Sequence, residues 1–164
     1  MQLTDAMIES ALENTVYMKQ NPWIMIAILC AVVLFLTFLF FKAQVSRQKI
    51  IAGALAGVFV LIGCATLPRN IQGKKHIENG EWYVVTATVD RVMEATKDGK
   101  KRYYAVLDKY GSISLANYAE AMKYYAGEAV YVVVIPDSDG YKSTGITYKT
   151  ADYTYEGSHQ GLPE

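Results

Sequence analysis

The sequence predicts an α+β membrane protein, in which an N-terminal helix and a two-helix transmembrane hairpin precede a small C-terminal β-barrel containing one short helix. The 164 residues include two long uncharged runs, both before residue 68, whereas all but one of the thirteen tyrosines come after residue 80. Residues 1–77 hold seven Lys and Arg against three Asp and Glu, and residues 78–164 hold nine against thirteen. Two segments of different composition are therefore joined end to end.

Residues 1–21 are predicted to form an amphipathic helix. Thr4 can cap this helix and Asp5 suits its first turn, because side-chain oxygens and negative charge stabilise helix N-termini. Side chains that are apolar or small recur at helical spacing on one face, at Ile8, Ala11, Leu12 and Thr15. We expect this face to lie on the membrane surface or to pair with a partner helix, and a frayed polar end is the alternative.

Two uncharged runs, 23–41 and 50–67, predict a transmembrane hairpin over residues 22–68. A helix of nineteen residues is about 28 Å long, close to the ~30 Å thickness of a bilayer's hydrocarbon core. The connection between the runs is polar and contains Lys42, Arg47 and Lys49 without an acid. The lipid bilayer is therefore the first partner that the sequence predicts.

The charges beside the first run predict an orientation. Cations tend to stay in the cytoplasm, and three follow this run whereas Lys19 alone precedes it. We expect two passes through the cell (plasma or inner) membrane, with the connection inside and both the N-terminus and the barrel outside. Arg69, Lys74 and Lys75 follow the second run and favour the opposite orientation.

A GxxxG motif, Gly53 and Gly57, lies in the second run. Two glycines one helical turn apart let another helix backbone approach closely. The motif suits packing of the two runs against each other and also self-association between copies, and a chance occurrence is the third interpretation. We expect helix packing at Gly53 and Gly57.

Residues 69–80 are predicted to be a linker, because this polar segment follows Pro68 and contains two glycines. From residue 81 the apolar period changes to two, which indicates strands. The strands are predicted over 81–96, 101–108, around 113–115, 129–135 and 141–148. We expect a bulge near Asp90 and a type I′ turn at Asp98-Gly99. A short extended piece near Tyr155 then precedes a polar tail, 157–164.

A short helix is predicted between the third and fourth strands. Asn117 can cap it, Glu120 completes a capping-box pattern, and Gly127 can end it. Its buried stripe is predicted to be Tyr118, Ala121, Met122 and Tyr125. The resulting order over residues 81–156, β-β-β-α-β-β, is that of an OB-like β-barrel, and another small barrel or an α+β sandwich is the alternative.

Membrane spans followed by a C-terminal OB-like domain resemble the layout of the NfeD family. The likeness lies in the order of the elements and implies an OB-like fold held at a membrane. No site residue is carried over from it.

The sequence contains no pattern typical of an active site. His76 and His159 are its only histidines, and Cys30 and Cys64 lie in uncharged runs, where a thiolate is disfavoured. No phosphate-binding loop, dinucleotide motif or nucleophile elbow is present. Asp139 lies in a segment that suits a hairpin turn better than a calcium loop. We therefore predict a protein that is not an enzyme, with no catalytic residue, no metal site and no cofactor.

A candidate ligand or partner face follows from the predicted fold, because OB-folds bind through their second and third strands and the loops beside them. Cations and tyrosines lie in this region, at Lys100, Lys101, Arg102, Tyr104, Tyr110 and Tyr141. Tyrosines beside cations can stack on bases, so a small molecule or nucleotide is one ligand class. The excess of acids argues against a nucleic-acid polymer. The alternative is that these tyrosines fill the core and interfaces.

Two function hypotheses result. The first is a membrane-anchored, non-enzymatic adaptor or assembly subunit that presents a tyrosine-rich barrel to a protein partner or to another copy. The alternative is a ligand-gated membrane effector, whose barrel senses a small molecule or nucleotide and whose spans oligomerise.

Overall fold

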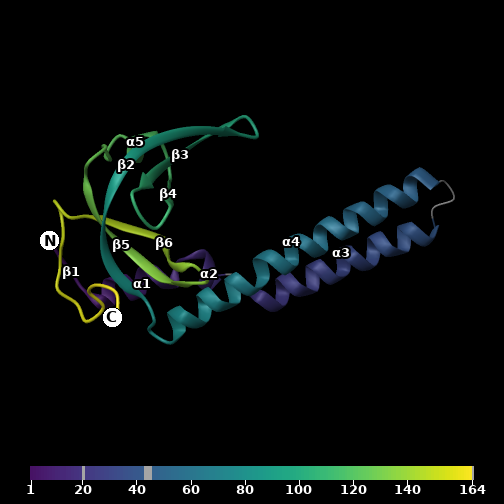
Figure 1. The fold of residues 1–164 in the computed structure, drawn as a ribbon, viewed down its shortest axis with the longest axis horizontal. Helices are drawn as coiled ribbons and strands as arrows, with labels where there is room; N and C mark the ends of the chain where they lie inside the picture. The colour runs from purple at the N-terminus through teal and green to yellow at the C-terminus, as the bar shows by residue number, and fades with distance from the viewer. Residues whose placement is uncertain (20, 43–45, 164) are drawn as a thin grey trace. The chain divides into compact units, whose positions relative to one another are not determined.

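The computed structural model describes residues 1–19, 21–42 and 46–163 (Figure 1). These residues form two compact units. The first unit contains residues 1–15 together with 76–164, and the second contains residues 16–75. The N-terminal segment therefore belongs with the C-terminal half of the chain, and the helical hairpin is inserted between them.

Five strands of the first unit form an antiparallel sheet that curves into a nearly closed barrel (Figure 1). They are β2 (Tyr83–Lys97), β3 (Lys100–Leu107), β4 (Ser112–Leu115), β5 (Ala129–Asp137) and β6 (Gly140–Lys149). The order across the sheet is β4-β3-β2-β5-β6, and its two outer strands, β4 and β6, approach each other. The sheet thus closes on itself without a continuous ladder at the seam.

The long strand β2 belongs to both halves of the sheet. It pairs with β5 from Tyr83 to Thr88 and with β3 from Val89 onward. A register shift between Val89 and Arg91 confirms the predicted bulge, which lets one strand bend from one half of the barrel to the other. Asp98 (φ 55°) and Gly99 (φ 72°) confirm the predicted turn, since a type I′ turn needs positive φ at both central residues.

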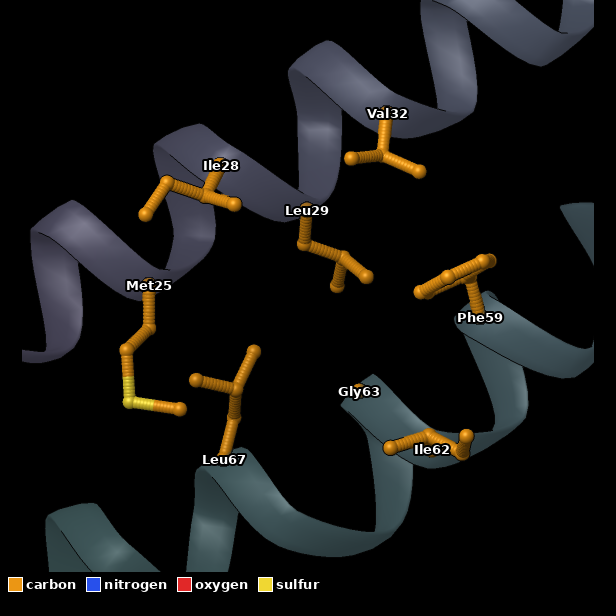
Figure 2. Close-up of a pocket in the computed structure, with 8 residues that line it drawn as sticks. All are labelled: Met25, Ile28, Leu29, Val32, Phe59, Ile62, Gly63 and Leu67. Carbon is orange, nitrogen blue, oxygen red and sulfur yellow. The ribbon is translucent and has the colours of Figure 1, made fainter.

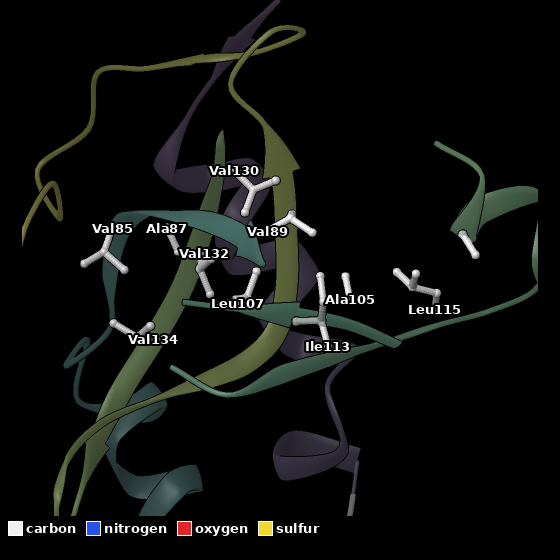
Figure 3. Close-up of a cluster of buried hydrophobic side chains, with 11 residues drawn as sticks. Val85, Ala87, Val89, Ala105, Leu107, Ile113, Leu115, Val130, Val132 and Val134 are labelled. Atoms are coloured by element: carbon white, nitrogen blue, oxygen red, sulfur yellow. The ribbon is translucent and has the colours of Figure 1, made fainter. Parts of the chain in front are cut away.

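The barrel interior is filled by side chains from β2, β3, β4, α5 and β5, most of them small or β-branched (Figure 3). Val85, Ala87 and Val89 alternate along β2 and are buried there, as the period of two predicts. The other members of this core are Ala105, Leu107, Ile113, Leu115, Ala121, Val130, Val132 and Val134. Partly buried tyrosines, among them Tyr83 and Tyr103, pack around it.

Strand β5 is buried on both faces, as its continuous apolar sequence predicts. Val132 and Val134 face the barrel interior, whereas Val133 and Ile135 alternate with them and are equally inaccessible to water. The other fully buried large side chains of this unit come from both chain ends and the start of the barrel: Leu3, Ile8, Leu12, Trp82 and Tyr155. The barrel therefore has a second apolar layer outside its sheet.

The N-terminal segment differs from the single helix predicted over residues 1–21. It forms β1 (Gln2–Leu3), α1 (Asp5–Glu13) and the single turn α2 (Val16–Lys19), and β1 pairs in parallel with β7 (Thr154–Tyr155). The predicted apolar face of α1 is buried within the barrel unit, so the membrane-surface and partner-helix predictions were wrong. Burial there shields Ile8 and Leu12 from water, which an isolated helix cannot do.

The second unit consists mainly of α3 (Pro22–Lys42) and most of α4 (Ser46–Glu78), two helices long and apolar enough to cross a membrane. A linker was predicted over residues 69–80, but residues 69–78 belong to α4, which continues past Pro68. The prediction was therefore wrong for these residues. One proline removes a single helical hydrogen bond and bends a helix without necessarily ending it. Gly80 (φ 72°) ends α4: the amides of Gly80 and Glu81 donate to the carbonyls of Ile77 and His76.

The short helix α5 (Tyr118–Ala121) is only one turn long. Its predicted cap is confirmed, since the Asn117 side chain accepts a hydrogen bond of 2.9 Å from the Glu120 amide. The predicted buried stripe was wrong except at Ala121, because a single turn directs only one side chain inward. Gly127 lies beyond the helix, in the turn before β5.

The predicted polar tail is bound to the barrel as far as Gly161. The Val84 amide donates to the His159 carbonyl at 2.8 Å, and the Gly161 amide donates to the Val84 carbonyl at 3.0 Å. Residue Gln160 thereby forms an isolated parallel bridge with Val84. Both chain ends consequently cover the same side of the barrel unit.

Candidate functional site

A groove of about 290 Å³ lies between the β2–β3 hairpin and α5. We call it the hairpin groove. One wall consists of strand residues, and the other consists of α5 and the residues that follow it. The strand wall contains Val92, Met93, Glu94 and Tyr103, and the opposite wall contains Tyr118, Ala121, Met122 and Tyr124.

Large apolar side chains around the hairpin groove are exposed to solvent. The exposed fraction is 38% for Met93, 59% for Tyr118 and 68% for Met122. Scattered exposed apolar residues are ordinary, but a cluster of them marks an interaction surface. Tyrosine and methionine are also enriched in protein–protein interfaces.

The strand wall carries one ion pair, with 2.9 Å between Lys101 Nζ and Glu94 Oε1. The hydrogen bond from Lys101 lowers the pKa of Glu94, although desolvation opposes this, and the same contact raises the pKa of Lys101. Desolvation, followed by the nearby Glu94 charge, raises the pKa of Tyr103. At neutral pH this wall therefore presents a neutralised pair beside a protonated tyrosine.

Lys149 holds the opposite wall in place. Its ammonium group lies 2.6 Å from a carboxylate oxygen of Glu128, which is almost fully buried. The same group lies 5.1 Å from the ring centre of Tyr124 and 5.6 Å from that of Tyr125. A cation above two aromatic rings fixes their orientation, so Lys149 positions the tyrosines next to the hairpin groove.

The six residues of the candidate face predicted from the sequence do not lie on one surface. Side chains alternate along β3, so Lys100, Arg102 and Tyr104 share its outer face, whereas Lys101 lies on the other face, beside the groove. Tyr110 and Tyr141 pack against the barrel core instead. The structure therefore brings three of the six predicted residues together, and the exposed groove residues Tyr118 and Met122 were missed. Helical periodicity misassigned these two residues to the core.

The two glycines of the GxxxG motif lie less tightly against α3 than Gly63 does. A Cβ atom added at Gly53 would lie 3.7 Å from Phe40, and one added at Gly57 would meet nothing within 4 Å in the described structure. At Gly63 it would overlap Leu29 Cδ2, and Figure 2 shows Leu29 directed at Gly63. Gly63 was missed because it belongs to no spaced pair of glycines.

An apolar gap of about 250 Å³ separates α3 from α4 around this contact (Figure 2). It is lined by Met25, Ile28, Leu29, Val32, Phe59, Ile62, Gly63 and Leu67. The two helices therefore pack through local contacts rather than along a continuous seam. The helix face at Gly57 stays accessible to another helix within the part of the chain that the structure describes.

A second polar cluster joins the two chain ends, and we call Asp5, Tyr155, Ser158 and His159 the terminal clasp. The Asp5 carboxylate accepts hydrogen bonds from the Tyr155 hydroxyl at 2.5 Å and from the Ser158 hydroxyl at 2.8 Å. Desolvation raises the pKa of Asp5, but these hydrogen bonds outweigh it and leave that pKa below its usual value. Desolvation and the bond to Asp5 raise the pKa of Tyr155.

The terminal clasp contains the residue types of a hydrolase triad in a different arrangement. In a triad the serine proton is directed at histidine, and the carboxylate binds the other ring nitrogen. Here the Ser158 hydroxyl donates to Asp5 and also lies 3.0 Å from His159 Nδ1, so all three groups converge. The His159 ring is stacked on Trp82 with 3.7 Å between ring centres. This geometry suits a structural link between the chain ends.

No protein-family model, curated protein or solved structure matches this chain. The likeness to the NfeD layout therefore depends on the order of the elements alone.

Proposed function

We propose that this protein is a membrane-anchored, non-enzymatic adaptor or assembly subunit that binds a partner protein through the hairpin groove. The observation that carries the proposal is the exposed rim of the groove, formed by Met93, Tyr118 and Met122. A rim of this composition loses contact with water when a partner covers it, which favours association. The ion pair of Glu94 and Lys101 offers polar contacts at the side of this apolar area.

Anchoring by a two-pass hairpin is supported by the chain path. Residues 1–15 and 76–164 belong to one compact unit, so the segments that precede and follow the two apolar helices must be on the same side of a membrane. An even number of crossings satisfies this requirement. The charges around α3 favour a cell membrane with the barrel unit outside the cytoplasm.

An OB-like barrel is part of this proposal. Three consecutive antiparallel strands, a short helix and a final hairpin lie in the order of that fold, and β4 and β6 approach each other at the seam. OB-folds bind through their second and third strands and the loops beside them. The hairpin groove adjoins the second strand, β3, through Tyr103, which supports a binding role for this region.

Site-specific photo-crosslinking in intact cells of the native host tests the proposal. A photoreactive amino acid at position 122 should give a covalent adduct larger than the protomer. The matched control carries the same group at Leu162, which is also exposed in the barrel unit but does not line the hairpin groove. Blue-native electrophoresis after mild extraction should show a complex that Tyr118→Ser with Met122→Ser removes and Leu162→Ser retains. A monomer with no adduct at position 122 would contradict the proposal.

The ligand-gated effector remains the alternative, and two observations favour it. Lys100, Arg102 and Tyr104 share the outer face of β3, where they can meet the phosphate and base of a nucleotide. The open helix face at Gly57 suits oligomerisation of the spans. Toxicity on induced expression should then disappear with Gly57→Leu and persist with Leu55→Phe, which adds bulk on another helix face.

A further inference from the structure

The distal half of β2 is an open strand edge. From Arg91 to Lys97, β2 pairs with β3 on one side, and on the other side the described residues contain no strand that pairs with it. Strand β5 occupies that side only as far as Thr88. Figure 1 shows the distal hairpin extending beyond the rest of the sheet. An open edge presents unpaired amide and carbonyl groups, which another strand can complete.

The hairpin groove adjoins this part of β2. Val92, Glu94 and Tyr103 line it from one face of the hairpin, since side chains alternate along β2 and Glu94 is the cross-strand partner of Tyr103. Met93 lines it as well. A strand added to the open edge would place every second side chain over this face, where the groove lies.

The charges on the edge argue against a second copy as its occupant. Antiparallel pairing of two β2 edges about Glu94 would place Glu94 opposite its own equivalent and Arg91 opposite Lys97. Like charges directly opposite each other destabilise a strand pair. Arg91 pairs with Asp90 only at an exposed position, where water weakens the interaction. Arg91 and Lys97 therefore complement a strand that carries acids near both of its ends.

We propose that the open edge of β2 from Arg91 to Lys97 binds an extended segment of a partner protein, apolar on one face and acidic at both ends, by strand addition. Main-chain hydrogen bonds to the edge supply affinity, and the hairpin groove receives the apolar side chains. Arg91 and Lys97 select the acidic ends. This inference rests on the proposed partner-binding function and specifies the partner's conformation and charge.

The test uses the full chain, purified in detergent, and labelled seven-residue peptides with blocked ends. The parent peptide alternates valine with threonine between two terminal glutamates, so that antiparallel pairing sets its glutamates opposite Arg91 and Lys97. Fluorescence anisotropy should show saturable binding of this peptide. Replacing both glutamates by lysine should weaken binding about tenfold, since two favourable cross-strand pairs become unfavourable. The variant Arg91→Glu with Lys97→Glu should reverse this preference.

Two isomers of the parent peptide, N-methylated at alternate sets of amides, test the main-chain hydrogen bonds. Only one set of amides can face β2, so one isomer should bind like the parent and the other at least tenfold more weakly. The inference is overturned if the two isomers bind with equal affinity, whether both bind like the parent or both fail to bind. It is also overturned if the parent peptide does not bind at 1 mM. If the adduct at position 122 then persists, partner binding stands without strand addition. If the peptide binds but no adduct forms at position 122, strand addition at this edge stands and the proposed partner binding through the hairpin groove does not.

Discussion

The Tyr155 hydroxyl donates a 2.5 Å hydrogen bond to the Asp5 carboxylate, across 150 residues of sequence that include both apolar helices. This contact joins the segment that precedes the hairpin to the segment that ends the barrel unit. Parallel pairing of Leu3 with Tyr155 reinforces it.

The first prediction concerns this hydrogen bond. Tyr155→Phe should accelerate amide hydrogen exchange in residues 3–13 by about tenfold, because a lost hydrogen bond from a buried hydroxyl costs about 1–1.5 kcal/mol. Tyr153→Phe is the matched control, since Tyr153 contributes a ring contact with Tyr148. Exchange is measured by mass spectrometry on the full chain in detergent. Equal exchange in the two variants would show that the terminal clasp does not hold the N-terminus.

The second prediction is that the attachment of residues 3–13 to the barrel unit through Asp5 depends on pH. The pKa of Asp5 is lowered from its ordinary 3.8 in the folded protein, so its stabilising effect is fully present above that value. It is lost as the pH falls through the lowered pKa. Exchange protection of residues 3–13 should therefore decrease below about pH 4 in the wild type. Asp5→Asn should show weaker protection with less pH dependence, and an unchanged pH profile would contradict this assignment.

The third prediction concerns Gly63. A Cβ atom there meets the flexible end of Leu29, which borders the apolar gap, so Gly63→Ala should change stability by less than about 1 kcal/mol. Gly63→Leu should destabilise the hairpin by about 1–3 kcal/mol, because its larger side chain overfills the contact. Gly57→Leu is the control and should be neutral in the monomer. Thermal unfolding in detergent, followed by circular dichroism, distinguishes these outcomes.

The fourth prediction compares two lysines that each pair with a glutamate. Lys149→Met leaves the nearly buried Glu128 carboxylate without its cation and should destabilise the barrel by about 3–5 kcal/mol. Lys101→Met breaks a pair that is well exposed and should change stability much less, because water screens that pair. Chemical denaturation monitored by Trp82 fluorescence measures both. If the two variants lose similar amounts of stability, burial does not determine how much each ion pair contributes.

Local chemistry explains which features were predictable. The turn at Asp98-Gly99, the cap at Asn117 and the alternation of Val85, Ala87 and Val89 depend on neighbouring residues, and all three were confirmed. The exposure of Tyr118 and Met122 was not predictable in this way. Helical spacing assigns them to one face, but it does not reveal that α5 ends at Ala121. The groove beside them therefore became visible only with the fold.

The sequence by itself determined two uncharged runs of helical length and five strands, because length, charge and period are properties of short segments. Only the tertiary structure decided that residues 1–15 belong with the barrel, and that β2 leaves an open edge from Arg91 to Lys97. Contacts such as the one between Asp5 and Tyr155 join residues that no local pattern relates. Such contacts form because burial of Leu3, Ile8 and Leu12 within the barrel unit removes from water apolar surface that the N-terminal segment alone would leave exposed.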